Sequence, residues 1–148
     1  MVKKNVLPGM VKMTGDARAL SKETNEKIAS KMLQIVEGIC NAHGVNGSVK
    51  YETACPVTFN SKIQADAATK AAISLLGNDK CNGDIEPCLF SEDFSMMTSE
   101  KPGCFILMGN GTSEQYSRPL HADNYDFNDE LLVIGSSYWT ELVEQQLK

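Results

Sequence analysis

The sequence predicts a protein of the α/β class, in which helices pack against strands. Three observations support this prediction. Apolar and polar residues alternate over residues 11–20, as in a half-buried strand. Apolar residues then recur at helical spacing over residues 21–43. A continuous apolar run at residues 104–108 is typical of a strand that is covered on both faces.

The first part of the chain predicts a strand, a helix and a second strand. The alternation over residues 11–20 is followed by Ser21, which can cap a helix that ends near His43 with Gly44 as a left-handed terminator. Alternation resumes over residues 49–53 as a second strand. One helix over two strands leaves sheet edges uncovered, so these elements are too few for an independent domain.

After a break at Pro56, an alanine-rich helix is predicted from Ala65 to Leu76, where Gly77 ends it. A polar loop follows at residues 78–84. A further short helix is predicted behind Ser91, which can serve as its cap.

The last third of the chain predicts a strand, a long loop and a closing helix. The strand at residues 104–108 leads into Gly109-Asn110-Gly111-Thr112, a turn that could offer backbone amides to a substrate but is more often only a turn. Asn128 is the expected cap of the final helix, which carries a broad apolar stripe.

Composition excludes two classes of partner. The chain has 148 residues and a formal charge of −5, with 19 acidic and 14 basic residues and no long run of one sign, which argues against nucleic acid. No apolar run approaches the roughly 18 residues of a membrane span. The charged start at residues 1–4 lacks the apolar stretch of a secretory signal. We therefore expect a soluble, cytoplasmic protein.

The cysteines follow no metal-binding pattern. They are odd in number, scattered, and without a C-x-x-C pair: Cys40, Cys55, Cys81, Cys88 and Cys104. Reduced thiols are the favoured interpretation. A disulfide between Cys81 and Cys88 remains open, because the sequence cannot place their α-carbons within bonding range.

His121 is the first candidate for chemistry. It lies on the loop before the closing helix, among carboxylates and amides, where a histidine can ligate a metal or simply form hydrogen bonds. The residues alone leave both roles open. The other histidine, His43, lies at a helix end, where a role in the cap region suffices.

Four motifs in the chain carry a resemblance. They are Asn5-Val6-Leu7-Pro8, Gly15-Asp16-Ala17-Arg18, Ser91-Glu92-Asp93-Phe94-Ser95, and His121 followed by Tyr125-Asp126-Phe127-Asn128-Asp129. In order and approximate spacing the chain resembles the amidohydrolase branch of metallopeptidase family twenty. That branch includes hippurate hydrolase, N-acetyl amino-acid deacetylases and plant hydrolases of indoleacetyl-amino-acid conjugates.

The resemblance implies two domains. Residues 1–55 correspond to the second half of a lid domain of sheet plus helix that mediates homodimer formation. Residues 56–148 correspond to the C-terminal segment of an α/β zinc-peptidase-like catalytic domain. The implied enzyme holds two divalent metal ions, manganese or zinc, and hydrolyses small N-acyl amino acids with metal-activated water.

Three residues take roles from the resemblance. His121 matches the last metal ligand, and Arg18 matches a lid arginine that approaches the substrate carboxylate, although an exposed arginine on a strand face would look the same. Asn5 matches an asparagine at the entry of a lid strand, which either faces the active site of the other subunit and binds substrate there or only fixes a turn before Pro8. No catalytic residue is carried over, because the chain contains no Glu-Glu pair, and Glu92 has an adequate explanation at a helix start.

Three functional hypotheses follow. The chain is a fragment of an N-acyl amino-acid amidohydrolase that is inactive alone, a portion of a dipeptidase or carboxypeptidase of the same family, or a non-catalytic protein that pairs with a full-length relative. The third hypothesis depends on an exposed sheet edge near residues 11–20.

Overall fold

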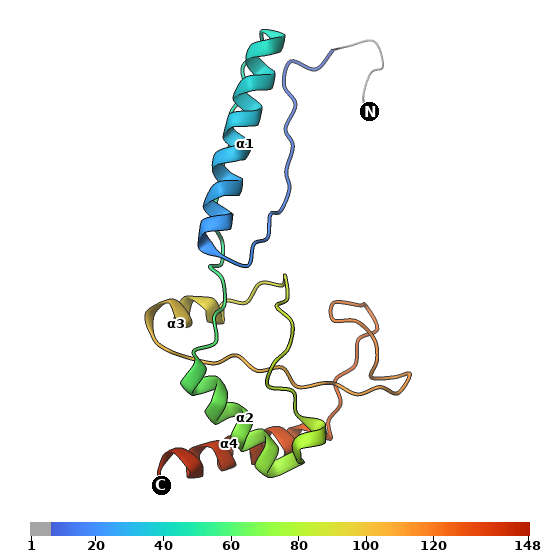
Figure 1. The fold of residues 1–148 in the computed structure, drawn as a ribbon. Helices are drawn as coiled ribbons and strands as arrows, with labels where there is room; N and C mark the ends of the chain where they lie inside the picture. The colour runs from blue at the N-terminus through green and yellow to red at the C-terminus, as the bar shows by residue number, and fades with distance from the viewer. Residues whose placement is uncertain (1–6) are drawn as a thin grey trace. The chain divides into compact units, whose positions relative to one another are not determined.

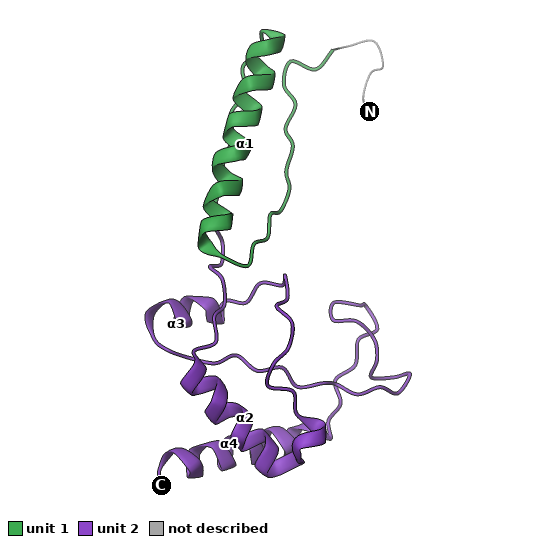
Figure 2. Cartoon of the chain, in the orientation of Figure 1, with its two compact units in different colours: residues 1–52 green, residues 53–148 purple. Residues whose placement is uncertain are grey.

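A computed structural model describes residues 7–148 of the chain. The helices are α1 (Lys22–His43), α2 (Lys62–Leu76), the short 3₁₀ helix η1 (Asn78–Lys80), α3 (Phe94–Glu100) and α4 (Leu131–Gln146) (Figure 1). The chain divides into two compact units, residues 1–52 and residues 53–148 (Figure 2). The assignment of residues 1–55 to a lid and residues 56–148 to a catalytic domain stays a prediction.

Both ends of α1 are set by local capping, as predicted. Ser21 has extended backbone angles, and its side chain accepts a hydrogen bond from the Thr24 backbone N–H at 3.0 Å. Gly44 adopts the left-handed conformation, with φ 64°, and Val45 N–H donates to the Cys40 carbonyl. These contacts satisfy backbone groups that the helix ends leave unpaired.

The chain after α1 passes close to the helix again. A β-carbon on Gly47 would lie 2.3 Å from Cys40 Sγ, so only glycine fits this approach without a shift. The Tyr51 hydroxyl donates a hydrogen bond to Asn25 Oδ1 in the first half of α1. Contacts at both points therefore hold this segment to the helix.

The predicted strands do not form within residues 7–148. Residues 11–20, 49–53 and 104–108 carry no strand assignment, so the sheet expected for the lid and for the catalytic segment is not realised in the described chain. A strand needs a neighbouring backbone to complete its hydrogen bonds, and the alternation of side chains alone cannot supply one.

At one of these segments, residues 104–108, the side chain of Asn60 forms backbone hydrogen bonds that a neighbouring strand would otherwise form. Asn60 Oδ1 accepts from the Phe105 N–H, and Asn60 Nδ2 donates to the Phe105 carbonyl, each at 2.8 Å. The Ser61 N–H also donates to the Gly103 carbonyl at 2.9 Å. These hydrogen bonds hold residues 103–105 beside the start of α2.

Unit 2 is organised by the packing of α2 against α4. Among the described residues the buried apolar side chains are Ala68, Ala71 and Tyr138, which lie on these two helices. The small alanines allow close approach of α4, and Ser74 Oγ donates to Glu141 Oε1 at 2.8 Å across the contact. The predicted alanine-rich helix is confirmed, although it begins three residues earlier, at Lys62.

The two later helices both begin without the predicted side-chain cap. Ser91 does not cap α3, which begins at Phe94 without a side-chain cap. The N-cap position of α4 is Glu130 and not Asn128; the Asn128 Oδ1 accepts from the Glu130 N–H at 3.1 Å in the turn before the helix. Much of the apolar stripe of α4 stays uncovered, with exposed side chains at Leu132, Val133, Trp139 and Val143.

Candidate functional site

His121 lies in a tight turn. The Ala122 N–H donates to the Pro119 carbonyl at 3.2 Å, which makes His121 the third residue of a four-residue turn. Its φ is 69°, the one positive value among the described non-glycine residues. Such a conformation is uncommon for a residue with a β-carbon and costs about 1–2 kcal/mol. The turn therefore holds an exposed imidazole at a cost in backbone energy.

Side chains on both sides of the turn brace the loop. Arg118 Nη1 donates to the Asn124 carbonyl at 2.7 Å, across the His121 turn itself. Further from the turn, Gln115 Nε2 donates to Asp126 Oδ2 at 2.6 Å. These two hydrogen bonds join the outgoing and returning halves of the loop.

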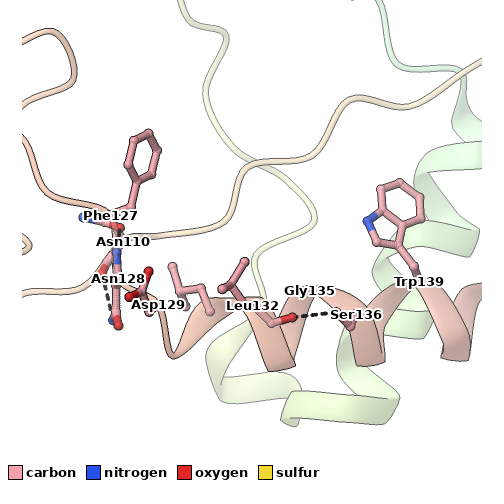
Figure 3. A pocket seen from close by; sticks show the side chains of 9 residues that line it. Asn110, Phe127, Asn128, Asp129, Leu132, Gly135, Ser136 and Trp139 are labelled. Atoms are coloured by element: carbon pink, nitrogen blue, oxygen red, sulfur yellow. Dashed lines mark hydrogen bonds between the residues drawn. The ribbon is translucent and has the colours of Figure 1, made fainter.

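The base of the loop is closed by two asparagines. Asn110 Oδ1 accepts from the Asn128 N–H at 2.9 Å, and Asn128 Nδ2 donates to the Asn110 carbonyl at 3.2 Å. Asn110 Nδ2 donates to the Tyr116 and Asp126 carbonyls at 3.1 and 2.8 Å. Figure 3 shows the two asparagines together at the start of α4.

A surface hollow of about 440 Å³ adjoins this base. Its lining is mostly apolar and includes Phe127, Leu132 and Trp139, with the asparagine pair at one end (Figure 3). His121 does not line the hollow. The hollow and the imidazole are therefore separate features of the loop and helix.

The other predicted site residues lie elsewhere. Arg18 is in unit 1, where its Nε donates to Asp16 Oδ2 at 2.9 Å. Asn5 lies outside the described residues. Glu92 and Asp93 precede α3, and their backbone carbonyls accept from the Ser95 and Met96 N–H groups. No side-chain hydrogen bond caps the helix, so a contribution of the two carboxylates to its start stays a prediction.

The donor set for a metal is incomplete in the described chain. A neutral imidazole is a suitable ligand for zinc or manganese, and His121 fits one position of such a site. Within residues 7–148 no three histidine, cysteine or carboxylate side chains gather into a metal-binding group. A catalytic metal usually takes about three protein ligands, and His121 stays a predicted candidate for one of them.

Burial raises the pKa of two ionisable groups, the hydroxyl of Tyr138 in α4 and the thiol of Cys104. Loss of solvent raises the pKa of the Tyr138 hydroxyl, and the nearby Cys104 raises it further. Burial also raises the pKa of the Cys104 thiol. Both groups are kept neutral at physiological pH, and all five cysteines are free thiols.

Comparison with known proteins decides the family. The family model described as "Peptidase family M20/M25/M40" matches residues 5–145, almost the whole chain. The chain belongs to this family. Membership confirms the resemblance that the four motifs carry, and it supports the α/β class, although the M20 chain is helical within residues 7–148.

Several curated relatives resemble this M20 chain. Hippurate hydrolase of Campylobacter jejuni is 30% identical over 144 residues, which cover 97% of this chain and 37% of the relative. N-acetylcysteine deacetylase of Bacillus subtilis is 28% identical, with coverage of 93% and 34%. Thermostable carboxypeptidase 2 of Saccharolobus solfataricus is 27% identical, with coverage of 90% and 34%. The M20 chain thus spans about a third of the length of these relatives.

Two other comparisons add less. No solved structure gives a significant match to the M20 chain. Within the described residues, no helix has the length and apolar character needed to cross a membrane.

Sequence reasoning did not find the residues that brace the loop. The sequence indicates Asn110 only as part of a glycine-rich turn, and no motif points to Gln115 or Arg118. The Asn-Gly pair at residues 110–111 signals a turn, but it does not reveal that the asparagine side chain bonds to residues 6 to 18 positions away.

Proposed function

We propose that this chain is part of a metal-dependent amidohydrolase that cleaves the amide bond of N-acyl amino acids, with His121 as one metal ligand. Family membership and the names of two relatives, a hippurate hydrolase and an N-acetylcysteine deacetylase, support the reaction class. The observation that carries the role of His121 is its exposed position in a braced, positive-φ turn.

The chemistry of the proposal divides between the metal and the chain. A bound divalent ion, zinc or manganese, supplies Lewis acidity toward the amide carbonyl and toward water. His121 offers one ring nitrogen, and the loop fixes the direction of the ring. The remaining ligands and the general base come from enzyme segments outside this chain, so we expect the chain to be inactive alone.

Two residues of the first unit are proposed to contact the substrate. A planar guanidinium suits the carboxylate of an N-acyl amino acid, because two parallel N–H groups can donate to it. Asp16 holds Nε of Arg18 and thereby orients that guanidinium. Asn5 is the second residue that we propose to contact the substrate.

We also propose a cytoplasmic homodimer in which residues 1–55 form half of the lid and residues 56–148 belong to the catalytic domain. The four exposed apolar side chains on α1 support an interface there: Met32, Leu33, Ile35 and Ile39. Sedimentation of the intact enzyme should give a dimer, and aspartate at Ile35 and Ile39 should convert it to a monomer.

The test places this chain in a complete enzyme. The part of this chain that matches the Campylobacter jejuni hippurate hydrolase would replace the corresponding portion of that enzyme, and hydrolysis of hippurate would be measured with manganese or zinc. We expect activity that falls at least 1,000-fold, together with loss of bound metal, in His121→Asn. Asparagine tolerates positive φ, so this variant removes the imidazole while it keeps the turn.

Two outcomes would contradict the proposal. A folded chimera that keeps full metal content and activity in His121→Asn would show that His121 is not a ligand. Stoichiometric metal and turnover in the purified 148-residue chain alone would show that it contains a complete site.

A carboxypeptidase or dipeptidase is the second candidate, favoured by the similarity to thermostable carboxypeptidase 2. The same chimera distinguishes the two, because a peptidase would prefer a free dipeptide or a peptide with a free carboxyl end to an N-acetyl amino acid. The non-catalytic alternative predicts instead that the chain co-purifies with a full-length relative and changes its activity.

A further inference from the structure

The loop that carries His121 is closed by side chains instead of a backbone ladder. Three sets of hydrogen bonds span it: Asn110 with Asn128 at the base, Gln115 with Asp126 in the middle, and Arg118 with the Asn124 carbonyl near the turn. No strand pairing supports the loop within the described chain. Its conformation therefore depends on a few side-chain amide and guanidinium groups.

Asn110 has the most contacts in this network. Its Oδ1 accepts one hydrogen bond and its Nδ2 donates two, so the side chain binds the backbone of Asn128, Tyr116 and Asp126 at once. Asn110 is half-buried, where a carbonyl that loses its donor is left poorly solvated. One side chain thus joins both halves of the loop to the start of α4.

We propose that Asn110 is the positioning residue for His121: its amide closes the base of the loop and so sets the direction in which the imidazole is presented. This inference rests on the proposed role of His121 as a ligand, because only a ligand needs a fixed direction. Asn110 does not touch the reacting atoms and lies 11 positions away in the sequence.

The test uses Asn110→Asp. The change keeps the size and the acceptor that binds the Asn128 N–H, but it places an oxygen against the carbonyls of Tyr116 and Asp126. Asn60→Asp is the matched control, because Asn60 also binds backbone through both atoms of its amide, at Phe105 and away from the loop.

Two measurements on the full chain read out the result. The first is amide hydrogen exchange over residues 111–127, which should become about tenfold faster in Asn110→Asp, as expected for loss of at least one net hydrogen bond. The second is the NMR spectrum of the imidazole C–H groups, recorded at the same pH for every variant. The chain has two histidines, so His43 in unit 1 is an internal reference.

We expect Asn110→Asp to shift the His121 resonances and leave those of His43 in place, while Asn60→Asp leaves both in place. Unchanged His121 resonances and unchanged exchange in Asn110→Asp would overturn the inference. Equal shifts in both variants would also overturn it, because the effect would then reflect general loosening of unit 2. A chimera that fails to hydrolyse hippurate would refute the proposed function without altering these spectra.

Discussion

Replacement of Gly47 by alanine should loosen the return of the chain over α1. The added β-carbon would lie 2.3 Å from Cys40 Sγ and 3.1 Å from Val36 Cγ1. Atoms in favourable contact are about 3.5–4.0 Å apart, so either the segment or the helix side chains must move. Overpacking of this kind costs roughly 1–3 kcal/mol. We expect the lower end, about 1 kcal/mol, because rotation of the Cys40 thiol can relieve part of the overlap.

Amide exchange over residues 45–52 and the second half of α1 measures this cost. Gly47→Ala should speed exchange there by about fivefold, the equivalent of about 1 kcal/mol. The double variant Cys40→Ala/Gly47→Ala removes the closer overlap and should recover most of the protection. Gly38→Ala is the control, because its β-carbon would meet nothing within 4 Å and alanine favours the helix. Wild-type exchange in Gly47→Ala, or no recovery in the double variant, would refute the reasoning.

Two further predictions concern titratable groups. Hydrogen bonds from Gln145 and Ser74 lower the pKa of Glu141 below 4.5, so its stabilising contribution is present above that pH and is lost as the pH falls through the lowered value. Loss of this contribution should make acid unfolding, followed by circular dichroism, begin at a higher pH in the wild type than the other titratable groups alone would cause. Glu141→Gln removes the titrating carboxylate and should therefore weaken the dependence of stability on pH below pH 4.5. Cys104 is half-buried with a raised pKa, whereas Cys88 is exposed, so iodoacetamide should alkylate Cys88 first. Peptide mass mapping over time measures the order of alkylation, and earlier modification of Cys104 would contradict this prediction.

Prediction from the sequence succeeded where structure is local. The cap at Ser21 and the left-handed Gly44 fix the ends of α1 through contacts within four residues, and those signals can be read directly. The predicted start of α3 was wrong, because the chain becomes helical only at Phe94 and no side chain caps the helix.

Strands were not predictable in the same way. The alternation over residues 11–20 predicts which side chains would share one face of a strand. A strand also needs a second extended segment to complete its backbone hydrogen bonds, and none pairs with residues 11–20 in the described part of the chain. The candidate site shows the same limit. His121 could be found from its motif, whereas the bonds of Asn110 join positions up to 18 residues apart, which no local pattern encodes.

The open apolar stripe of α4 also provides an optical probe. Trp139 is the only tryptophan in the chain, it is 59% exposed, and it lines the hollow beside the loop base. Indole fluorescence shifts to shorter wavelength when water around the ring is replaced by protein. A partner or segment that binds over this stripe would therefore change the emission colour of the native chain, and its binding could be followed in real time without an added dye.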